Sequence, residues 1–218
     1  KKDADLMQKY AERAFRTVGI SANQYMEIVT SFSASLLQGL GGDTKKAAKI
    51  ADMAMRDMGD NANKFGTDMQ SIQNAYQGFA RGQYMMLDNL KLGYGGTKEE
   101  MERLLKDAQK ISGVKYNIKN LSDIYSAIHV IQKELGVTGT TAKEASTTFT
   151  GSFNAMKAAA QNLLGNLAMG ENIQQSLEGL VSSAWTFLAG NLLPMAGTIL
   201  KSMALLVINN INKVPGLI

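Results

Sequence analysis

Cysteine is absent from this chain, and its 218 residues include only one histidine and two prolines. Without cysteine the chain can form neither a disulfide bond nor a thiolate metal site, so packing alone must stabilise its fold. A zinc site would need several imidazole or thiolate ligands, which a single imidazole cannot replace. The composition therefore excludes a disulfide-stabilised scaffold, and we expect no metal site.

Charge is scarce in the C-terminal third. The whole chain carries 23 basic and 19 acidic residues, a formal net charge of +4, and up to residue 151 both signs are mixed along the sequence. The charged residues that remain beyond this point are Lys157, Glu171, Glu178, Lys201 and Lys213. Nucleic-acid recognition calls for a clustered basic face, so this distribution predicts no specific nucleic-acid binding. It also predicts a change of environment near residue 150.

Short amphipathic helices are predicted over residues 1–140, because apolar residues recur there at intervals of three and four between glycines. The predicted N-caps are Ser21, Asp43, Thr97 and Ser122, and further capping boxes are predicted at Thr67 with Gln70 and at Thr141 with Glu144. Residues 114–118 alternate as a strand would, but a lone strand has no partner. We therefore predict an all-α fold, with an amphipathic multi-helix bundle over 1–140, a long connecting helix over 141–170 and an apolar helical region over 171–218.

A glycine-rich turn at residues 93–96 precedes one of these helices. Positions without a Cβ favour a sharp, irregular turn, and Thr97 with Glu100 then forms the capping box of the helix that follows. The turn matches neither the order GxxxxGK[ST] of a phosphate loop nor the third glycine of a dinucleotide fingerprint. We expect no cofactor here and interpret three residues as a structural turn: Gly93, Gly95 and Gly96.

Candidate catalytic residues are few. His129 stands between apolar neighbours on a predicted helix, and a lone histidine there is expected to be structural or exposed rather than a base or a ligand. Glu99 and Glu100 begin a helix and are expected to face solvent, and we expect the same of Asp57 and Asp60. A cell-wall hydrolase would need an acid pair or zinc ligands, so we predict that this chain is not an enzyme.

The predicted connecting helix has the spacing of a coiled coil, since apolar residues alternate at steps of four and three. Two interpretations remain open: the helix pairs with other copies of the chain, or it is a core helix of the same bundle. The candidate self-association residues on it are Phe149, Phe153, Met156, Leu163 and Leu167.

No charged residue lies between Gly179 and Leu200, which is about the length of a membrane-spanning helix. Gly190 and Pro194 would kink or divide such a helix, so a membrane helix and a buried hairpin turning at residues 191–194 both remain open. The candidate residues for membrane contact or self-association are Trp185, Phe187, Leu188, Leu192, Leu193, Ile199, Leu200, Leu205, Leu206, Val207 and Ile208. A membrane-inserting channel or pore module with no ruler role is thus an alternative function.

Four stretches, in order along the chain, carry a family resemblance. The first stretch covers residues 21–82 and begins with SANQYMEIV. The other three are YMMLDNLKLGYGGTKEEMERLLKDAQKISG (84–113), AIHVIQKELGVTGTTAKEAS (127–146) and GSFNAMKAAAQNLLGNLAMG (151–170). Together they resemble tail tape measure proteins of long-tailed phages and prophages of Gram-positive bacteria, whereas residues 171–218 match only in their apolar character. Because the chain begins at Lys1 without an initiator methionine, we expect it to be an internal segment of such a protein.

The resemblance implies a structural role without catalytic residues, cofactor or metal. Tape measure proteins set tail length while tail subunits stack around them, and they leave the tube on infection to help the genome cross the cell envelope. The implied partners are the tail tube protein, tail-tip or baseplate proteins, a tail assembly chaperone, the host membrane and further copies of the chain, with a trimer favoured. The implied locations are the tail lumen in the virion, the host cytoplasm during assembly and the host membrane on ejection.

Overall fold

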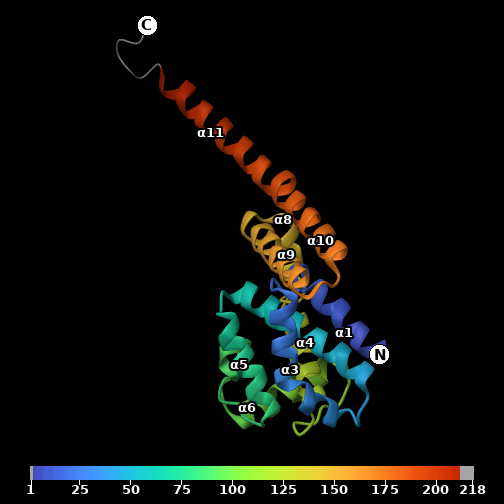
Figure 1. The fold of residues 1–218 in the computed structure, drawn as a ribbon. Coiled ribbons are helices and arrows are strands. Elements are labelled where there is room, and N and C mark those ends of the chain that lie inside the picture. The colour runs from blue at the N-terminus through green and yellow to red at the C-terminus, as the bar shows by residue number, and fades with distance from the viewer. Residues whose placement is uncertain (1, 212–218) are drawn as a thin grey trace.

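A computed structural model describes residues 2–211, apart from the side chains of residues 2–4, 204 and 206–211. These residues form helices and their connections, with no strand among them, which confirms the predicted all-α fold (Figure 1). The first helices are α1 (Lys2–Glu12), α2 (Ala14–Thr17), α3 (Ala22–Gly39), α4 (Thr44–Phe65), α5 (Met69–Ala80), η1 (Leu87–Leu90), α6 (Lys98–Ser112) and α7 (Leu121–Glu134). The chain continues with α8 (Thr140–Thr147), α9 (Phe149–Met169), α10 (Ile173–Trp185), the π-helical η2 (Thr186–Leu192) and α11 (Leu193–Ile211).

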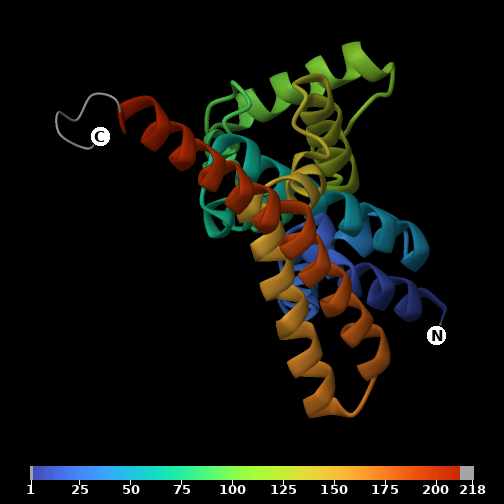
Figure 2. The ribbon, with the colours of Figure 1, turned by 90° about the horizontal axis from the view of Figure 1, so that it is seen from above.

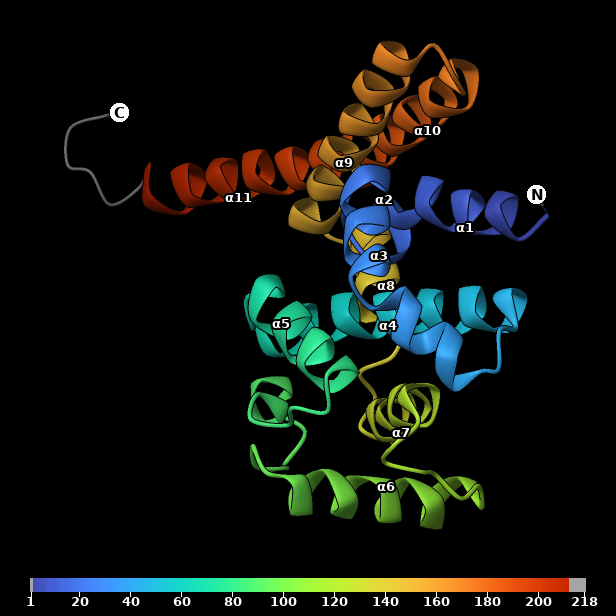
Figure 3. The same ribbon diagram turned by 60° about the horizontal axis from the view of Figure 1, so that its bottom comes forward.

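The helices α1 to α7 surround one main core. Helix α4 crosses its middle between α3 and α7, and α6 covers α7 on the other side (Figure 3). Buried aromatic side chains meet there: the ring of Tyr125 lies 5.0 Å from that of Tyr76, and its hydroxyl donates to the Tyr76 carbonyl. Phe32 packs edge-on against Tyr125 at 5.5 Å, and the Tyr25 hydroxyl donates to the buried carboxylate of Asp52. Aromatic pairs of this kind stabilise a core beyond the area that they bury.

Most predicted helix starts of this core are correct. The side chains of Ser21, Asp43 and Thr97 accept hydrogen bonds from backbone amides in the first turns of α3, α4 and α6. The prediction of Ser122 is wrong by two residues, because the Asn120 side chain accepts from the Ser122 amide and caps α7. Residues 114–118 form an irregular connection rather than a strand.

Two predicted capping boxes are wrong. Helix α5 is capped by Asp68 instead of Thr67, since the Asp68 carboxylate accepts from the first turn and also favours the positive end of the helix dipole. Helix α8 begins one residue before Thr141, after Gly139 in a left-handed conformation with φ +87. The cap of α8 comes from another helix, because the Asp60 carboxylate of α4 accepts from the amides of Gly139 and Thr141.

The predicted connecting helix over 141–170 is broken at Thr148. This residue is extended, with φ −119 and ψ 152, and its hydroxyl accepts from the Gly151 amide to cap α9. A Cβ on Gly151 would overlap the carbonyl of Glu144, so glycine lets the end of α8 lie against the start of α9. The break is stabilised because the first amides of a helix have no partner within that helix. The Thr148 side chain supplies such a partner, as a helix cap does.

The structure does not confirm the hairpin that the sequence left open at residues 191–194. The chain reverses earlier, at Gly170 with φ +70, where α9 ends and α10 begins (Figure 2). From there α10, η2 and α11 continue in one direction past Pro194. Proline removes an amide donor and clashes with the preceding helical turn, and a widened π-helical turn just before it accommodates both effects. The Asn191 side chain also donates to the Thr186 carbonyl within this turn.

Candidate interaction surface

We call residues 2–147 the bundle and residues 149–211 the arm. The arm consists of α9, α10, η2 and α11, and α11 extends away from the bundle in both views (Figures 1 and 2). Of the 22 large apolar side chains that are exposed among the described residues, 16 belong to the arm, although it is less than half as long as the bundle. Such a concentration of exposed apolar side chains is typical of an interaction surface, so the arm is the candidate functional surface.

An aromatic cluster joins the two halves of the arm near its base. Phe187 of η2 is buried, and its ring lies 5.1 Å from that of Phe149 and 5.4 Å from that of Phe153 on α9. The rings of Phe149 and Phe153 are themselves stacked at 6.4 Å. The structure thus brings three candidate residues together within one chain. Phe149 and Phe153 nevertheless stay about two-fifths exposed, at 38% and 43%.

The other candidate residues of α9 lie outside its bundle-facing side. Met156 and Leu163 are half-buried, and Leu167 is exposed. The side of α9 that does face the bundle was not predicted, and it consists of small and polar residues: Ser152, Ala155, Ala158, Ala159 and Asn162. The run of alanines at 158–160 was the available signal, because small residues let helices approach closely.

The candidate residues farther along the arm are mostly uncovered. Trp185 is 72% exposed, and Leu193 and Leu200 are similar. Leu188, Ile199 and Leu205 are also exposed, whereas Leu192 is half-buried. The side chains of Leu206, Val207 and Ile208 lie outside the described part. Among the helices that are described, none combines the length and apolar character needed to cross a bilayer.

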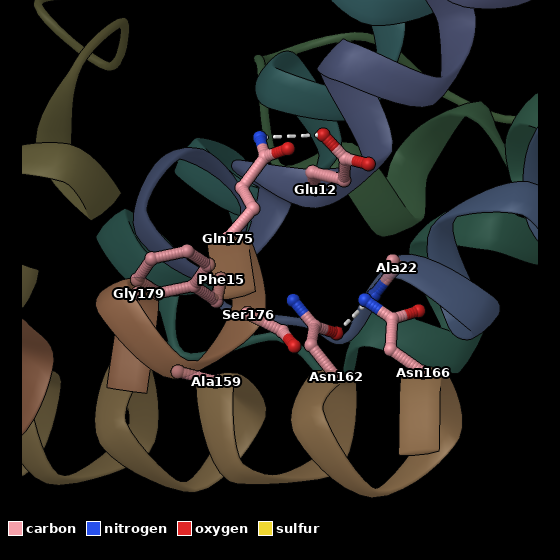
Figure 4. A pocket seen from close by; sticks show the side chains of 9 residues that line it. All are labelled: Glu12, Phe15, Ala22, Ala159, Asn162, Asn166, Gln175, Ser176 and Gly179. Carbon is pink, nitrogen blue, oxygen red and sulfur yellow. Dashed lines mark hydrogen bonds between the residues drawn. The ribbon is translucent and has the colours of Figure 1, made fainter. Parts of the chain in front are cut away.

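The inner face of the arm covers one aromatic side chain of the bundle. Phe15 of α2 is 6% exposed and packs against Ala155, Ala158 and Ala159 of α9, with Gly179 of α10 beside its ring (Figure 4). The cavity next to it measures about 20 Å³, which holds about one water molecule. This cavity is too small for a substrate or cofactor.

Four side-chain hydrogen bonds join arm and bundle among the described residues, the longest from the Asn191 side chain to the Ser146 carbonyl at 3.5 Å. The Asn162 side-chain oxygen accepts from the Ala22 amide at 2.7 Å, which satisfies a free donor at the start of α3 (Figure 4). The Gln175 side chain donates to Glu12 at 2.7 Å. The Arg16 guanidinium donates to the Ser182 hydroxyl at 2.5 Å. The arm is therefore attached through a few specific groups rather than through an extended apolar core.

No known protein family, curated protein or solved structure matches this chain.

The main titratable cluster lies on α4. The expectation that Asp57 and Asp60 face solvent is wrong, since they are 1% and 2% exposed. Asp57 accepts from Nδ1 of His129 on α7, at 2.9 and 3.1 Å for its two oxygens. Burial raises the pKa of Asp57 to about 6, and the hydrogen bond to Asp57 raises the pKa of His129. The two aspartates hold helices together. Asp57 links α4 to α7 through His129, and Asp60 caps α8.

Neither this cluster nor the glycine turn forms a candidate metal site within the described residues. No group of three or more His, Cys, Asp or Glu side chains there could hold a metal ion. In the turn, Gly93 has φ +86, and a Cβ on Gly96 would overlap the carbonyl of Met85. A Cβ on Gly95 would make only an ordinary contact, at 3.5 Å from Glu100. Two of the three glycines are thus required by the backbone.

The turn is held by one ion pair. Arg103 pairs with Glu100 at 2.6 Å, donates to the Gly93 carbonyl at 2.7 Å and lies 4.4 Å from the centre of the Tyr94 ring. Glu100 in turn accepts from the Gly95 amide at 2.9 Å. These contacts fix the start of α6 against the preceding chain.

Proposed function

We propose that this chain is a non-enzymatic structural segment of a phage tail tape measure protein, in which the bundle is a folded body and the arm is a contact surface. The observation that carries the proposal is the concentration of exposed apolar side chains on an arm that extends away from the bundle (Figure 1). Exposure of leucine-sized side chains costs about 1.5–3 kcal/mol each relative to burial. The arm is therefore expected to be covered in the assembled protein.

In this proposal the arm pairs with further copies of the chain, with a trimer favoured, inside the lumen of the tail tube. The parent protein sets tail length during assembly and contacts the tail tube, the tail tip or baseplate and an assembly chaperone in the host cytoplasm. On infection it is ejected and assists genome delivery across the envelope, where the arm meets the host membrane. The compact bundle is a poor spacer, so the ruler itself lies in other parts of the parent protein.

The test is the mass of the purified chain by light scattering, with and without detergent. The change is a triple arm variant, Trp185→Ser, Leu193→Ser and Leu200→Ser, at side chains that the bundle does not cover. We expect the unmodified chain to form oligomers in buffer and the arm variant to be a monomer with the same circular dichroism spectrum.

The matched control replaces exposed apolar residues of the bundle, with Met26→Ser, Met85→Ser and Leu135→Ser. This variant should remain oligomeric, because it leaves the arm intact. A monomeric unmodified chain in detergent-free buffer would contradict the proposal.

The alternative is a membrane-inserting channel or pore module. It is favoured by the position of Trp185 and Lys201 at either end of an uncharged stretch, where aromatic and basic side chains would meet the two interfaces. The discriminating measurement is dye release from liposomes. Release by the unmodified chain that is lost in the arm variant would favour the pore, whereas oligomers that bind no liposomes would favour the purely structural role.

A further inference from the structure

The seam between arm and bundle is built differently from the main core. The core cluster of the bundle contains 29 buried residues, with aromatic side chains from α3, α5 and α7. The seam has a separate cluster of only four buried residues, in which Phe15 meets three alanines. Segments with few buried apolar contacts open at a lower free energy than the whole molecule. The apolar cluster of the seam is thus much smaller than that of the main core. We therefore expect the seam to open at a lower free energy than the main core.

The seam is bordered by a crevice of about 300 Å³ at the start of α9. It lies between α2 and α4 on one side and α8 and α9 on the other. Thr67 and Thr141, both residues of the bundle, line it, and their hydroxyls are buried without a hydrogen-bond partner among the described residues. The start of α9 contributes Gly151 and Asn154, so this end of the arm borders a crevice instead of a filled interface.

The break at Thr148 provides a pivot beside the seam. On its bundle side, α8 is fixed by Asp60, whose carboxylate caps the helix and whose carbonyl accepts from the Thr140 hydroxyl at 3.1 Å. On its arm side, a single extended residue separates α8 from α9. Hinges are commonly one or a few residues at element ends, where φ and ψ can change without breaking a helix.

The arm beyond the pivot is internally connected. Phe187 packs between Phe149 and Phe153, so η2 is joined to the start of α9. Helices α9 and α10 lie side by side along their length in both views (Figures 1 and 2). A rotation at Thr148 would therefore move α9, α10, η2 and α11 together.

We propose that the arm detaches from the bundle as one unit about Thr148, with Phe15 and the Asn162–Ala22 hydrogen bond acting as the latch. Detachment breaks the contacts of the seam and exposes the alanine face of α9, while the main core of the bundle stays intact. This inference is independent of the proposed function, since it concerns a single chain and needs neither a second copy nor a membrane.

Because the chain contains no cysteine, single introduced thiols report the opening directly. The two reporter variants are Ala159→Cys in the seam and Ala54→Cys in the main core, which replace alanines that are 1% and 0% exposed. Under native conditions we expect a thiol reagent to label the first variant on the order of 100-fold faster than the second. Equal labelling rates would overturn the proposal, because the seam would then open only with the whole molecule.

The latch is tested by Phe15→Ala in each reporter background. Truncation of a buried phenylalanine should raise seam labelling on the order of 100-fold and leave Ala54→Cys labelling unchanged. The matched control, Phe79→Ala in the main core, should accelerate the labelling of Ala54→Cys instead. No acceleration of seam labelling by Phe15→Ala would also overturn the proposal.

A second reporter pair covers the case in which Ala159→Cys itself opens the seam. Ser176→Cys beside Phe15 and Ser122→Cys in α7 replace buried serines with a side chain of nearly the same shape. The same order of rates, with Ser176→Cys faster, is expected. The reverse order would count against the proposal.

Discussion

The bundle and the arm of this chain bury apolar surface in opposite ways. Of the 36 buried apolar residues among those described, only four lie on the arm, three of them alanines. The bundle turns its large side chains inward onto a tyrosine-rich centre, whereas the arm turns mainly small ones inward and leaves most of its leucines exposed. The contrast shows that the apolar content of a helix does not by itself tell whether the helix belongs to a core or to a contact surface. What distinguishes the two is whether the large apolar residues face the rest of the chain or the solvent.

The largest expected effect is a loss of unfolding free energy from a substitution in the core of the bundle. Phe32→Ala removes a side chain that is 1% exposed and packs against Tyr125, and should lower the free energy of unfolding by about 3–5 kcal/mol. Leu200→Ala on the arm, where the side chain is 67% exposed, should change it by less than about 0.5 kcal/mol. Urea unfolding followed by circular dichroism measures both. Similar losses for the two variants would mean that Leu200 is covered in the isolated chain.

The second effect is a pH dependence that belongs to the bundle. The pKa of Asp57 is about 6 in the folded chain, above its ordinary value of 3.8, so the folded state binds this proton more tightly than the unfolded state does. The resulting stability is present at acidic pH and falls as the pH rises through about 6. The raised pKa of His129 acts in the same direction, because its contribution is present below its unfolded value and is lost as the pH rises through the folded one.

We therefore expect the bundle to be less stable at pH 8 than at pH 5, with a contribution of at most about 1.5 kcal/mol from Asp57 over this range. The measurement is urea unfolding at a series of pH values between these limits. Asp57→Asn keeps an oxygen that can accept from His129, but it removes both the titration of the carboxylate and the charge that raises the pKa of His129, so the difference between the two profiles reports the Asp57–His129 pair. A profile of the unmodified chain that rises with pH would show that the sign is wrong.

The third effect acts at the junction of the two regions. Gly151→Ala places a methyl group against the Glu144 carbonyl, and overpacking of this kind should cost about 1–3 kcal/mol. Its control is Gly170→Ala at the turn between α9 and α10, where φ is +70 and no atom lies within 4 Å of the new Cβ. Only Gly151→Ala should speed hydrogen exchange in α8. Unchanged exchange in α8 would indicate that the junction can shift to admit the methyl group.

The smallest effect concerns the arm. Gly197 lies within α11, and a Cβ added at this position would meet no atom within 4 Å, so Gly197→Ala should stabilise this helix by about 1 kcal/mol through helix propensity alone. Hydrogen exchange of the α11 amides should slow about fivefold, while exchange in the bundle stays the same. Faster exchange in α11 would mean that the glycine serves a close contact with another surface.

Sequence reasoning recovered the features of the bundle that depend on neighbouring residues. The caps at Ser21, Asp43 and Thr97 need only the next three amides, so their sequence context was sufficient. The break at Thr148 was missed because the same context also suits a helix interior, and its geometry depends on the carbonyl of Glu144.

The candidate surface was predicted in outline and missed in detail. The loss of charge near residue 150 indicated where the arm begins. The burial of Asp57 and Asp60 could not be read from the sequence, because their partners lie 72 or more residues away, on α7 and at the start of α8. The pairing of Phe187 with Phe149 and Phe153 was hidden for the same reason, since it depends on the turn at Gly170.

The π-helical turn of η2 also changes the angular phase of the long helix that contains it. Hydrogen bonds from i to i+5 add residues to a turn, as an insertion does in a coiled coil, so the faces before and after the turn are rotated with respect to each other. A helical wheel drawn with a constant angle from Ile173 to Ile211 would therefore assign α10 and α11 residues to a shared side that they do not have. Cross-linking sites or stapled peptides for this helix must be planned separately on each side of residues 186–192.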